Sequence, residues 1–149
     1  MLKIAVRGEL VTKVPATILL GEDNPADVYL IRQALQDSGV DCILQVATHG
    51  GEMITAIEAA EMTPDLVVLD LNLPRHDGLE ILQLIRSKNR FQAVPVVILT
   101  SSDSPKDRAA ASELGADYYI RKPSNLDDFI AIGATLESLL NARPRAATQ

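Results

Sequence analysis

The segment Leu66-Val67-Val68-Leu69-Asp70 is a run of four aliphatic residues that ends in an acid. An apolar run this short, with no polar residue on either face, is typical of a buried strand in a parallel sheet. A second such run, Val96-Val97-Ile98-Leu99, ends at Thr100. Similar runs occupy residues 17–21, 42–47 and 117–121. The sequence therefore predicts five strands that are apolar on both faces.

Amphipathic segments lie between these runs, and several have recognisable ends. Asn24-Pro25 supplies an N-cap side chain and a first-turn proline, and Gly39 follows as a stop. Ser104-Pro105 begins another helix, which ends at Leu114-Gly115. Further helices are predicted over residues 50–61, from Gly78 through Arg86, and from about Asn125 to Leu140. This order predicts an α/β fold of five βα units, a doubly wound parallel five-stranded sheet with helices on both faces.

Length and composition fit one globular domain. The chain has 149 residues, of which 47% are hydrophobic. We expect the domain to cover residues 17–140, with no room for a second domain after it. The composition of residues 141–149 predicts a disordered tail. Residues 1–16 are open to two interpretations, an extra strand pair at 2–6 and 10–14 or a disordered leader.

Charge and composition exclude several classes of function. The net charge is −6 and aromatic residues are only 3%, which argues against nucleic-acid binding through bulk charge or base stacking. The single cysteine, Cys42, allows no internal disulfide and no cysteine-cluster metal site. We find no apolar run long enough for a membrane span and no secretory signal, and therefore expect a soluble cytoplasmic protein.

Polar residues follow four of the five predicted strands. Glu22 and Asp23 follow the first, Asp70 the third, Thr100 the fourth and Lys122 the fifth. In an open parallel sheet, ligands bind outside the carboxyl ends of the strands. Clustered carboxylates repel one another, and Mg²⁺, which prefers carboxylate oxygens, would relieve that repulsion. A metal, a lysine and a hydroxyl also suit phosphoryl transfer to a carboxylate nucleophile, for which Asp70 is best placed.

Four motifs in sequence order carry a family resemblance. They are Leu-Gly-Glu-Asp-Asn at 20–24, Leu-Asp-Leu-Asn-Leu-Pro-Arg-His-Asp-Gly at 69–78, Leu-Thr-Ser at 99–101 and Lys-Pro at 122–123. In combination they resemble the response-regulator receiver domain of two-component signalling, over residues 17–140. The resemblance implies a flavodoxin-like fold with strand order 2-1-3-4-5.

The resemblance also implies roles for the acidic residues. Asp70 would be the phosphoacceptor and therefore the modified residue. Asp23 and Asp70 would ligate Mg²⁺ directly, and Glu22 would act largely through metal-bound water. Asn72 would offer its backbone carbonyl to the metal.

Further roles are implied for residues that follow the last two strands. Thr100 would be the switch hydroxyl that moves toward the phosphoryl group, and Tyr119 the switch aromatic that turns inward. Lys122 would pair with the phosphoryl oxygens, and the peptide bond before Pro123 would be cis. Gly78 would help to shape the loop after Asp70.

The function implied is that of a single-domain response regulator. A sensor histidine kinase would donate the phosphoryl group to Asp70, and the domain would catalyse only its own phosphorylation and dephosphorylation. The run at 22–28 is similar to receivers paired with bacterial phytochrome histidine kinases. The signal would leave through a partner protein or through a homodimer formed by the fourth helix, fifth strand and fifth helix, where Ala109–Ala111 allow close approach and the last helix is rich in apolar residues. No nucleic acid or membrane partner is expected.

Three other functions are compatible with a fold of this class. A hydrolase of the haloacid dehalogenase type would need an aspartate where Asn72 stands. A flavin or dinucleotide binder would need a glycine-rich loop after the first strand, where this chain has acids. A pseudo-receiver, which binds partners without being phosphorylated, would not need the complete set of site residues and remains the alternative.

Overall fold

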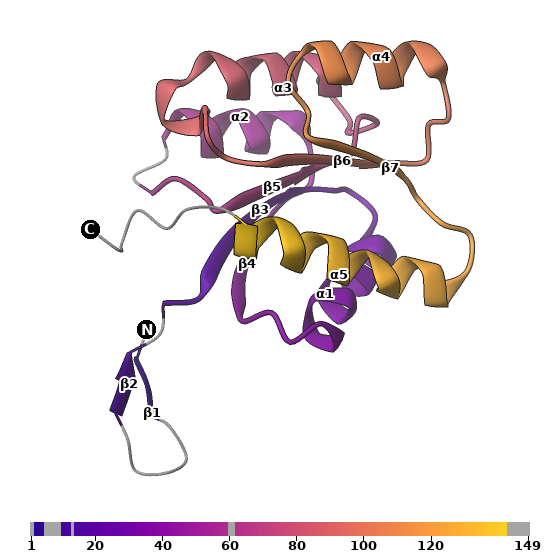
Figure 1. Ribbon diagram of the computed structural model, residues 1–149. Coiled ribbons are helices and arrows are strands. Elements are labelled where there is room, and N and C mark those ends of the chain that lie inside the picture. Colours follow the sequence, from indigo (N-terminus) through magenta and orange to yellow (C-terminus); the bar gives the residue numbers. More distant parts are fainter. Residues whose placement is uncertain (1, 5–9, 13, 60–61, 143–149) are drawn as a thin grey trace.

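The structure is a computed structural model that describes residues 2–4, 10–12, 14–59 and 62–142. Within them, five parallel strands alternate with five α-helices (Figure 1). In chain order the elements are β1 (Leu2–Ile4), β2 (Leu10–Thr12), β3 (Ala16–Gly21), α1 (Pro25–Asp37), β4 (Cys42–Ala47), α2 (Gly50–Glu58), β5 (Leu66–Leu69), α3 (Gly78–Ser87), a 3₁₀ turn η1 (Asn89–Phe91), β6 (Val96–Thr100), α4 (Pro105–Glu113), β7 (Tyr118–Arg121) and α5 (Leu126–Ala142).

The main sheet has the strand order β4-β3-β5-β6-β7, with every neighbouring pair parallel. This is the predicted 2-1-3-4-5 order, with the chain reversing direction across the sheet after its first two strands. Helices α1 and α5 cover one face, and α2, α3 and α4 cover the other (Figure 1). The predicted α/β class and topology are confirmed. Strands β1 and β2 form a separate antiparallel pair, and the remaining residues before Val14 lie outside the described part of the chain.

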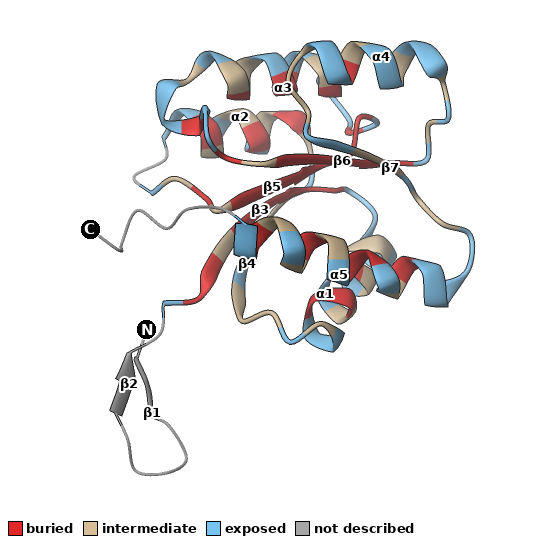
Figure 2. Cartoon of the chain, viewed as in Figure 1, coloured by how far each residue is buried: buried red, intermediate tan, exposed pale blue. Residues whose placement is uncertain are grey.

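The core is thickest around the two strands that the sequence marked most clearly. Every residue of β5 and β6 is buried, with at most 1% exposure (Figure 2). Because alternate residues of a strand face opposite sides, these strands supply both hydrophobic clusters. One cluster packs against α2, α3 and α4, and the other against α1 and α5. Burial on both faces explains why these strands are apolar throughout.

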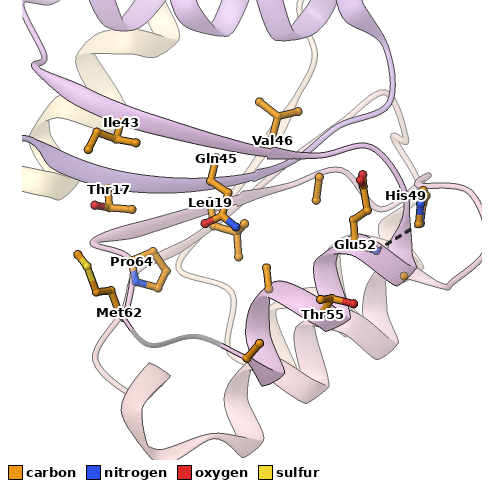
Figure 3. A pocket seen from close by; sticks show the side chains of 14 residues that line it. Thr17, Leu19, Ile43, Gln45, Val46, His49, Glu52, Thr55, Met62 and Pro64 are labelled. Atoms are coloured by element: carbon orange, nitrogen blue, oxygen red, sulfur yellow. Dashed lines mark hydrogen bonds between the residues drawn. The ribbon is translucent and has the colours of Figure 1, made fainter.

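The prediction that all five strands are buried on both faces is wrong for β4. Its burial alternates, and Ile43 is 50% exposed. Residues Ile43 and Gln45 line an open groove of about 720 Å³ between β3, β4 and α2 (Figure 3). The reason is that β4 is an edge strand and the nine-residue α2 covers its outer part incompletely. The other edge strand, β7, is likewise only partly buried.

The helix ends follow the predicted capping residues closely. The side chain of Asn24 accepts a hydrogen bond from the amide of Ala26, and that of Ser104 accepts one from Asp107. Gly39 and Gly115 follow their helices with φ of +73° and +97°, a conformation that glycine adopts without strain. Helix α2 ends at Glu58, before the predicted limit, and residues 60–61 are outside the described part.

Helix α5 uses its apolar stripe for the core. Phe129, Ile132, Leu136 and Leu140 are all buried, and α5 lies against α1. The two helices approach so closely that a Cβ on Gly133 would lie 2.1 Å from the carbonyl oxygen of Ala34. These apolar residues therefore do not form a free dimer patch. The helix runs to Ala142, two residues past the predicted limit of the domain, and residues 143–149 are not described. No described helix is long and apolar enough to cross a membrane.

Candidate functional site at the carboxyl edge of the sheet

The predicted site residues meet at the carboxyl ends of the central strands. Backbone hydrogen bonds continue the sheet pattern one residue past the strands and fix where the side chains begin. The amide of Asp70 donates to Gly21 O at 3.0 Å, and the amide of Lys122 donates to Thr100 O at 2.8 Å. The amide of Glu22 donates to the carbonyl of the last residue of β4 at 2.9 Å. The parallel sheet thus converts positions far apart in the sequence into one cluster.

Three carboxylates in this cluster can hold a metal ion. One oxygen each from Glu22, Asp23 and Asp70 lie within 4.8 Å of one another. Glu22 and Asp70 are buried, while Asp23 is exposed. Three hard oxygen donors with one side open to water match the needs of Mg²⁺, which keeps several of its waters. The donor set therefore fits the divalent metal expected from the sequence.

Lys122 is the cation of the cluster. Its Nζ lies 2.8 Å from Glu22 Oε1, 2.8 Å from Asp27 Oδ2 and 2.8 Å from Asp70 Oδ2. An ammonium group has three N–H donors, so these carboxylates use its full donor capacity. Asp23, with an oxygen within 4.8 Å of oxygens of Glu22 and Asp70, adds a fourth carboxylate, so the described site carries a surplus of negative charge.

Burial and hydrogen bonding change the ionisation of two groups. Desolvation raises the pKa of Glu22, and hydrogen bonds from Lys122 and from the amide of Asn24 offset this only in part. For Lys122, burial alone would lower the pKa, but hydrogen bonds to Asp27, Asp70 and Glu22 outweigh burial, so its pKa is raised. Lys122 is therefore held as a cation, whereas burial disfavours the charged form of Glu22.

Thr100 is fully buried and lies beside the acidic cluster. Its Oγ1 accepts hydrogen bonds from Asn72 Nδ2 at 3.2 Å and from the amide of Ser102 at 3.4 Å. The amide of Asn72 donates in turn to Asp70 Oδ1 at 2.9 Å. Asn72 therefore connects the predicted phosphoacceptor with the predicted switch hydroxyl.

The loop after Asp70 turns sharply back to start α3. A Cβ on Gly78 would lie 2.5 Å from the Cα of Leu71, so only glycine allows this approach. Within the loop, Arg75 has φ of +77°, a left-handed conformation that is costly for a residue with a side chain. The amide of Gly50, at the start of α2, donates to the carbonyl of Pro74 at 3.0 Å and anchors the loop.

None of the hydrogen bonds described for Tyr119 leads to the acidic cluster. Its hydroxyl donates to the carbonyl of Ser102 at 3.2 Å, and the guanidinium of Arg108 lies 4.4 Å from the centre of its ring. It thus links β7 to the loop that follows Thr100. One expectation in this region is wrong: the Lys122–Pro123 peptide bond is trans. Trans is the favoured isomer before proline, and it already allows the lysine to reach all three carboxylates.

Sequence reasoning missed Asp27 as a site residue. Asp27 lies in the first turn of α1, where an acidic side chain interacts favourably with the helix dipole, and this local role already accounts for its presence in the sequence. The signal that was available is topological: α1 begins at the same edge of the sheet where Lys122 follows β7. The groove of Figure 3 is lined by none of the residues of the acidic cluster, so it belongs to a different part of the surface.

Comparison with known proteins gives consistent matches. The family model of the response regulator receiver domain matches residues 18–133. The response regulator Rcp1 of Synechocystis sp. is 34% identical over 129 residues, which cover 83% of this chain and 88% of that protein. The transcriptional regulatory protein TrcR of Mycobacterium tuberculosis is 38% identical over 117 residues, which cover 78% of this chain and 43% of TrcR. The chain thus spans less than half of TrcR and most of Rcp1.

Solved structures agree with the sequence matches. The phosphorylated cyanobacterial phytochrome response regulator RcpA superposes with a TM-score of 0.79 at 34% identity, covering 87% of this chain and 96% of RcpA. The Mn²⁺-bound form of Rcp1 gives a TM-score of 0.76 at 34% identity, covering 83% of this chain and 93% of Rcp1.

Proposed function

The chain belongs to the response regulator receiver family of two-component systems, and from that premise we propose that Asp70 accepts a phosphoryl group from a sensor histidine kinase in a Mg²⁺-dependent reaction. The observation that carries the proposal is the position of Asp70. Its buried carboxylate lies between a lysine, a second buried carboxylate and an open acidic edge.

The chemistry is a transfer between two protein side chains. One oxygen of the Asp70 carboxylate attacks the phosphorus of a phosphohistidine, and a new O–P bond forms as the N–P bond breaks. The electron pair stays on the imidazole nitrogen, which takes up a proton. Lys122 supplies positive charge to an oxygen of the transferring group, and the Thr100 hydroxyl can donate to another.

The metal would be held by Asp23 and Asp70, with Glu22 acting through metal-bound water and Asn72 through its backbone carbonyl. When bound, Mg²⁺ neutralises the surplus carboxylate charge and the charge that develops on the phosphoryl oxygens. Glu22 supports this role because its burial makes a charge-balancing cation favourable.

The hydrogen bonds of Thr100 support a conformational switch in this proposal. If its hydroxyl turns toward a phosphoryl oxygen, the present bonds from Asn72 and Ser102 change. Ser102 also accepts from Tyr119, so movement of this loop reaches β7 and the α4-β7-α5 surface. We expect Thr100 and Tyr119 to act as one linked switch.

Intact mass spectrometry tests the phosphorylation. We expect the protein incubated with Mg²⁺ and acetyl phosphate to gain one phosphoryl group, and the gain to be lost with EDTA or in Asp70→Asn. Asp103→Asn is the matched control, since Asp103 is 63% exposed and contacts only Arg121 among the pairs described. An adduct that survives in Asp70→Asn would contradict the assignment. No adduct from acetyl phosphate or from phosphorylated kinases would favour the phosphorylation-independent pseudo-receiver.

For the upstream partner, we propose a histidine kinase of the phytochrome type in the cytoplasm. The support is the similarity to Rcp1 and to the phytochrome response regulator RcpA. A panel of purified kinases tests it: transfer from a phytochrome kinase should be faster than transfer from unrelated kinases at equal concentration.

The downstream signal, in this proposal, passes through α4, β7 and α5, either to a partner or to a second copy. Tyr118 on β7 is 49% exposed and Leu126 at the start of α5 is 60% exposed, which leaves apolar surface near this face. Ala111 is fully buried and Ala110 is partly buried, so Ala109 is the one exposed member of the small-residue run. Sedimentation with and without beryllofluoride tests the homodimer, and a monomer in both states at high concentration would contradict it.

A further inference from the structure

Of the three carboxylates that pair with Lys122 in the described part of the chain, Asp27 is the one that lies in a helix. The other two, Glu22 and Asp70, follow strands of the sheet and are buried, with side-chain exposures of 1% and 5%. The Asp27 side chain is 19% exposed at the first turn of α1. All three contacts have the same length, 2.8 Å.

A phosphoryl group on Asp70 would need a donor from Lys122. Phosphorylation esterifies Asp70 and frees the N–H that now contacts it, but Lys122 can offer a second donor to the phosphoryl group only if Glu22 or Asp27 gives up its contact. Glu22 cannot be released at low cost, because a buried carboxylate without its cation loses both solvation and pairing. Asp27 can be released, since its partly exposed carboxylate can be hydrated by water.

Charge adds to this competition. Asp27 contributes a negative charge next to the lysine that would receive the phosphoryl oxygens. A dianionic phosphoryl group and the Asp27 carboxylate would therefore compete for the same ammonium group and also repel each other. The same charge favours a bound divalent cation.

We propose that Asp27 is a positioning residue that holds Lys122 in the unphosphorylated site and opposes its capture by the phosphoryl group. The proposal rests on the phosphoacceptor role proposed for Asp70. Its consequence is that Asp27 sets the balance between the two states of the site without contacting the phosphoryl group itself.

The direction of two binding affinities tests this role. In Asp27→Asn, we expect beryllofluoride, a phosphoryl mimic, to bind about three- to tenfold more tightly at saturating Mg²⁺. In the same variant, Mg²⁺ alone should bind more weakly, by about two- to fivefold, because one nearby negative charge is lost. Fluorine NMR reports the bound mimic, and titration calorimetry reports Mg²⁺. A purely structural role would weaken both affinities together.

Three further variants complete the experiment. Asp27→Ala removes the carboxylate without leaving an amide oxygen for Lys122, and should shift both affinities further in the same directions. Asp27→Glu keeps the charge and should stay within about twofold of the wild type. Asp37→Asn removes a charge from the exposed last residue of the same helix and should change neither affinity.

The outcomes separate the two proposals. If wild-type protein does not bind the mimic at saturating Mg²⁺, the proposed function fails and this inference fails with it. If wild-type protein binds the mimic but Asp27→Asn binds it equally or more weakly, the positioning role of Asp27 is overturned while the phosphoacceptor role of Asp70 stands.

Discussion

The two ends of the parallel sheet each hold a cation, and the two cations have different surroundings. At the amino end, Arg86 donates to the carbonyls of Gly115, Phe91 and Val94 at 3.0, 2.8 and 2.9 Å, and to Asp117 at 3.0 Å. At the carboxyl end, Lys122 donates to three carboxylates. Both side chains are mostly buried, with exposures of 18% and 12%.

The difference lies in the charge balance. One carboxylate neutralises Arg86, and its other partners are neutral backbone oxygens, so the amino end is satisfied as it stands. Its contacts join α3, the turn before β6 and the loop before β7, which is a structural task. At the carboxyl end, Lys122 pairs with three carboxylates and Asp23 adds a fourth to the cluster, a surplus of negative charge that a bound cation would balance. A buried network whose charges balance indicates a structural role. A buried network with unbalanced charge indicates a site for a ligand.

The largest expected difference between the two ends of the sheet is the loss of stability when Arg86 is replaced. Arg86→Ala would remove four hydrogen bonds, and we expect the free energy of unfolding to fall by about 2–4 kcal/mol. Among the bonds described, the carbonyls of Gly115 and Val94 would lose their donor, while Asp117 Oδ2 would keep the amide of Val96. Urea denaturation measures this loss of stability. The phosphoryl adduct at Asp70 should still form in the folded fraction of this variant.

A matched arginine provides the control for this prediction. Arg121 contacts Asp103 at 3.4 Å, and both side chains are about 60% exposed. Arg121→Ala should therefore cost less than about 1 kcal/mol. Equal losses in the two variants would show that the amino-end network is no more important than a surface ion pair.

The fold could be predicted because the strongest signals came from residues with one structural explanation. The runs at 66–69 and 96–99 are apolar on both faces since both faces are buried, and their ends coincide with the observed strands to within one residue. The run at 42–47 is also mostly apolar, but it forms an edge strand. The composition of a strand shows that it is apolar. It does not show how much of the strand a helix will cover, and here the nine-residue α2 leaves part of β4 uncovered.

The residues of the site could be predicted from the sequence, but the contacts between their side chains could not. Parallel topology explains why Glu22, Asp70 and Lys122 were expected at one edge, and the structure places them there. The ion pair between Asp27 and Lys122 joins residues 95 positions apart, and no local pattern encodes such a pairing. Sequence patterns place Arg86 only at the end of a helix, because three of its four described acceptors are backbone carbonyls, whose positions no side-chain pattern reveals.

A second, smaller effect is expected from magnesium. A ligand that binds only the folded state at ten times its dissociation constant raises the free energy of unfolding by about 1.4 kcal/mol. We expect Mg²⁺ to do so for the wild type and for Arg86→Ala alike, because the acidic cluster and the arginine network lie at opposite ends of the sheet. Thermal unfolding with Mg²⁺ or EDTA measures it. Asp23→Asn should lose most of the gain, and an unchanged gain in that variant would contradict the assigned metal site.

The smallest effect is the pH dependence due to Glu22. Burial raises its pKa in the folded state above the ordinary value of 4.5, so the unfolded protein ionises this group more easily. Its contribution to stability is therefore fully present below pH 4.5 and is lost as the pH rises through the raised folded pKa.

Measurement of this effect needs a difference between variants, because other groups titrate in the same range. Without Mg²⁺, the free energy of unfolding of the wild type should fall relative to Glu22→Gln as the pH rises from about 4.5 toward neutrality. Glu113→Gln, at the exposed end of α4, should keep the wild-type profile. Saturating Mg²⁺ should reduce the difference, because the metal favours the ionised carboxylate. If the difference had the opposite sign, ionised Glu22 would be stabilised by its surroundings, and the carboxyl end would be as well balanced as the amino end.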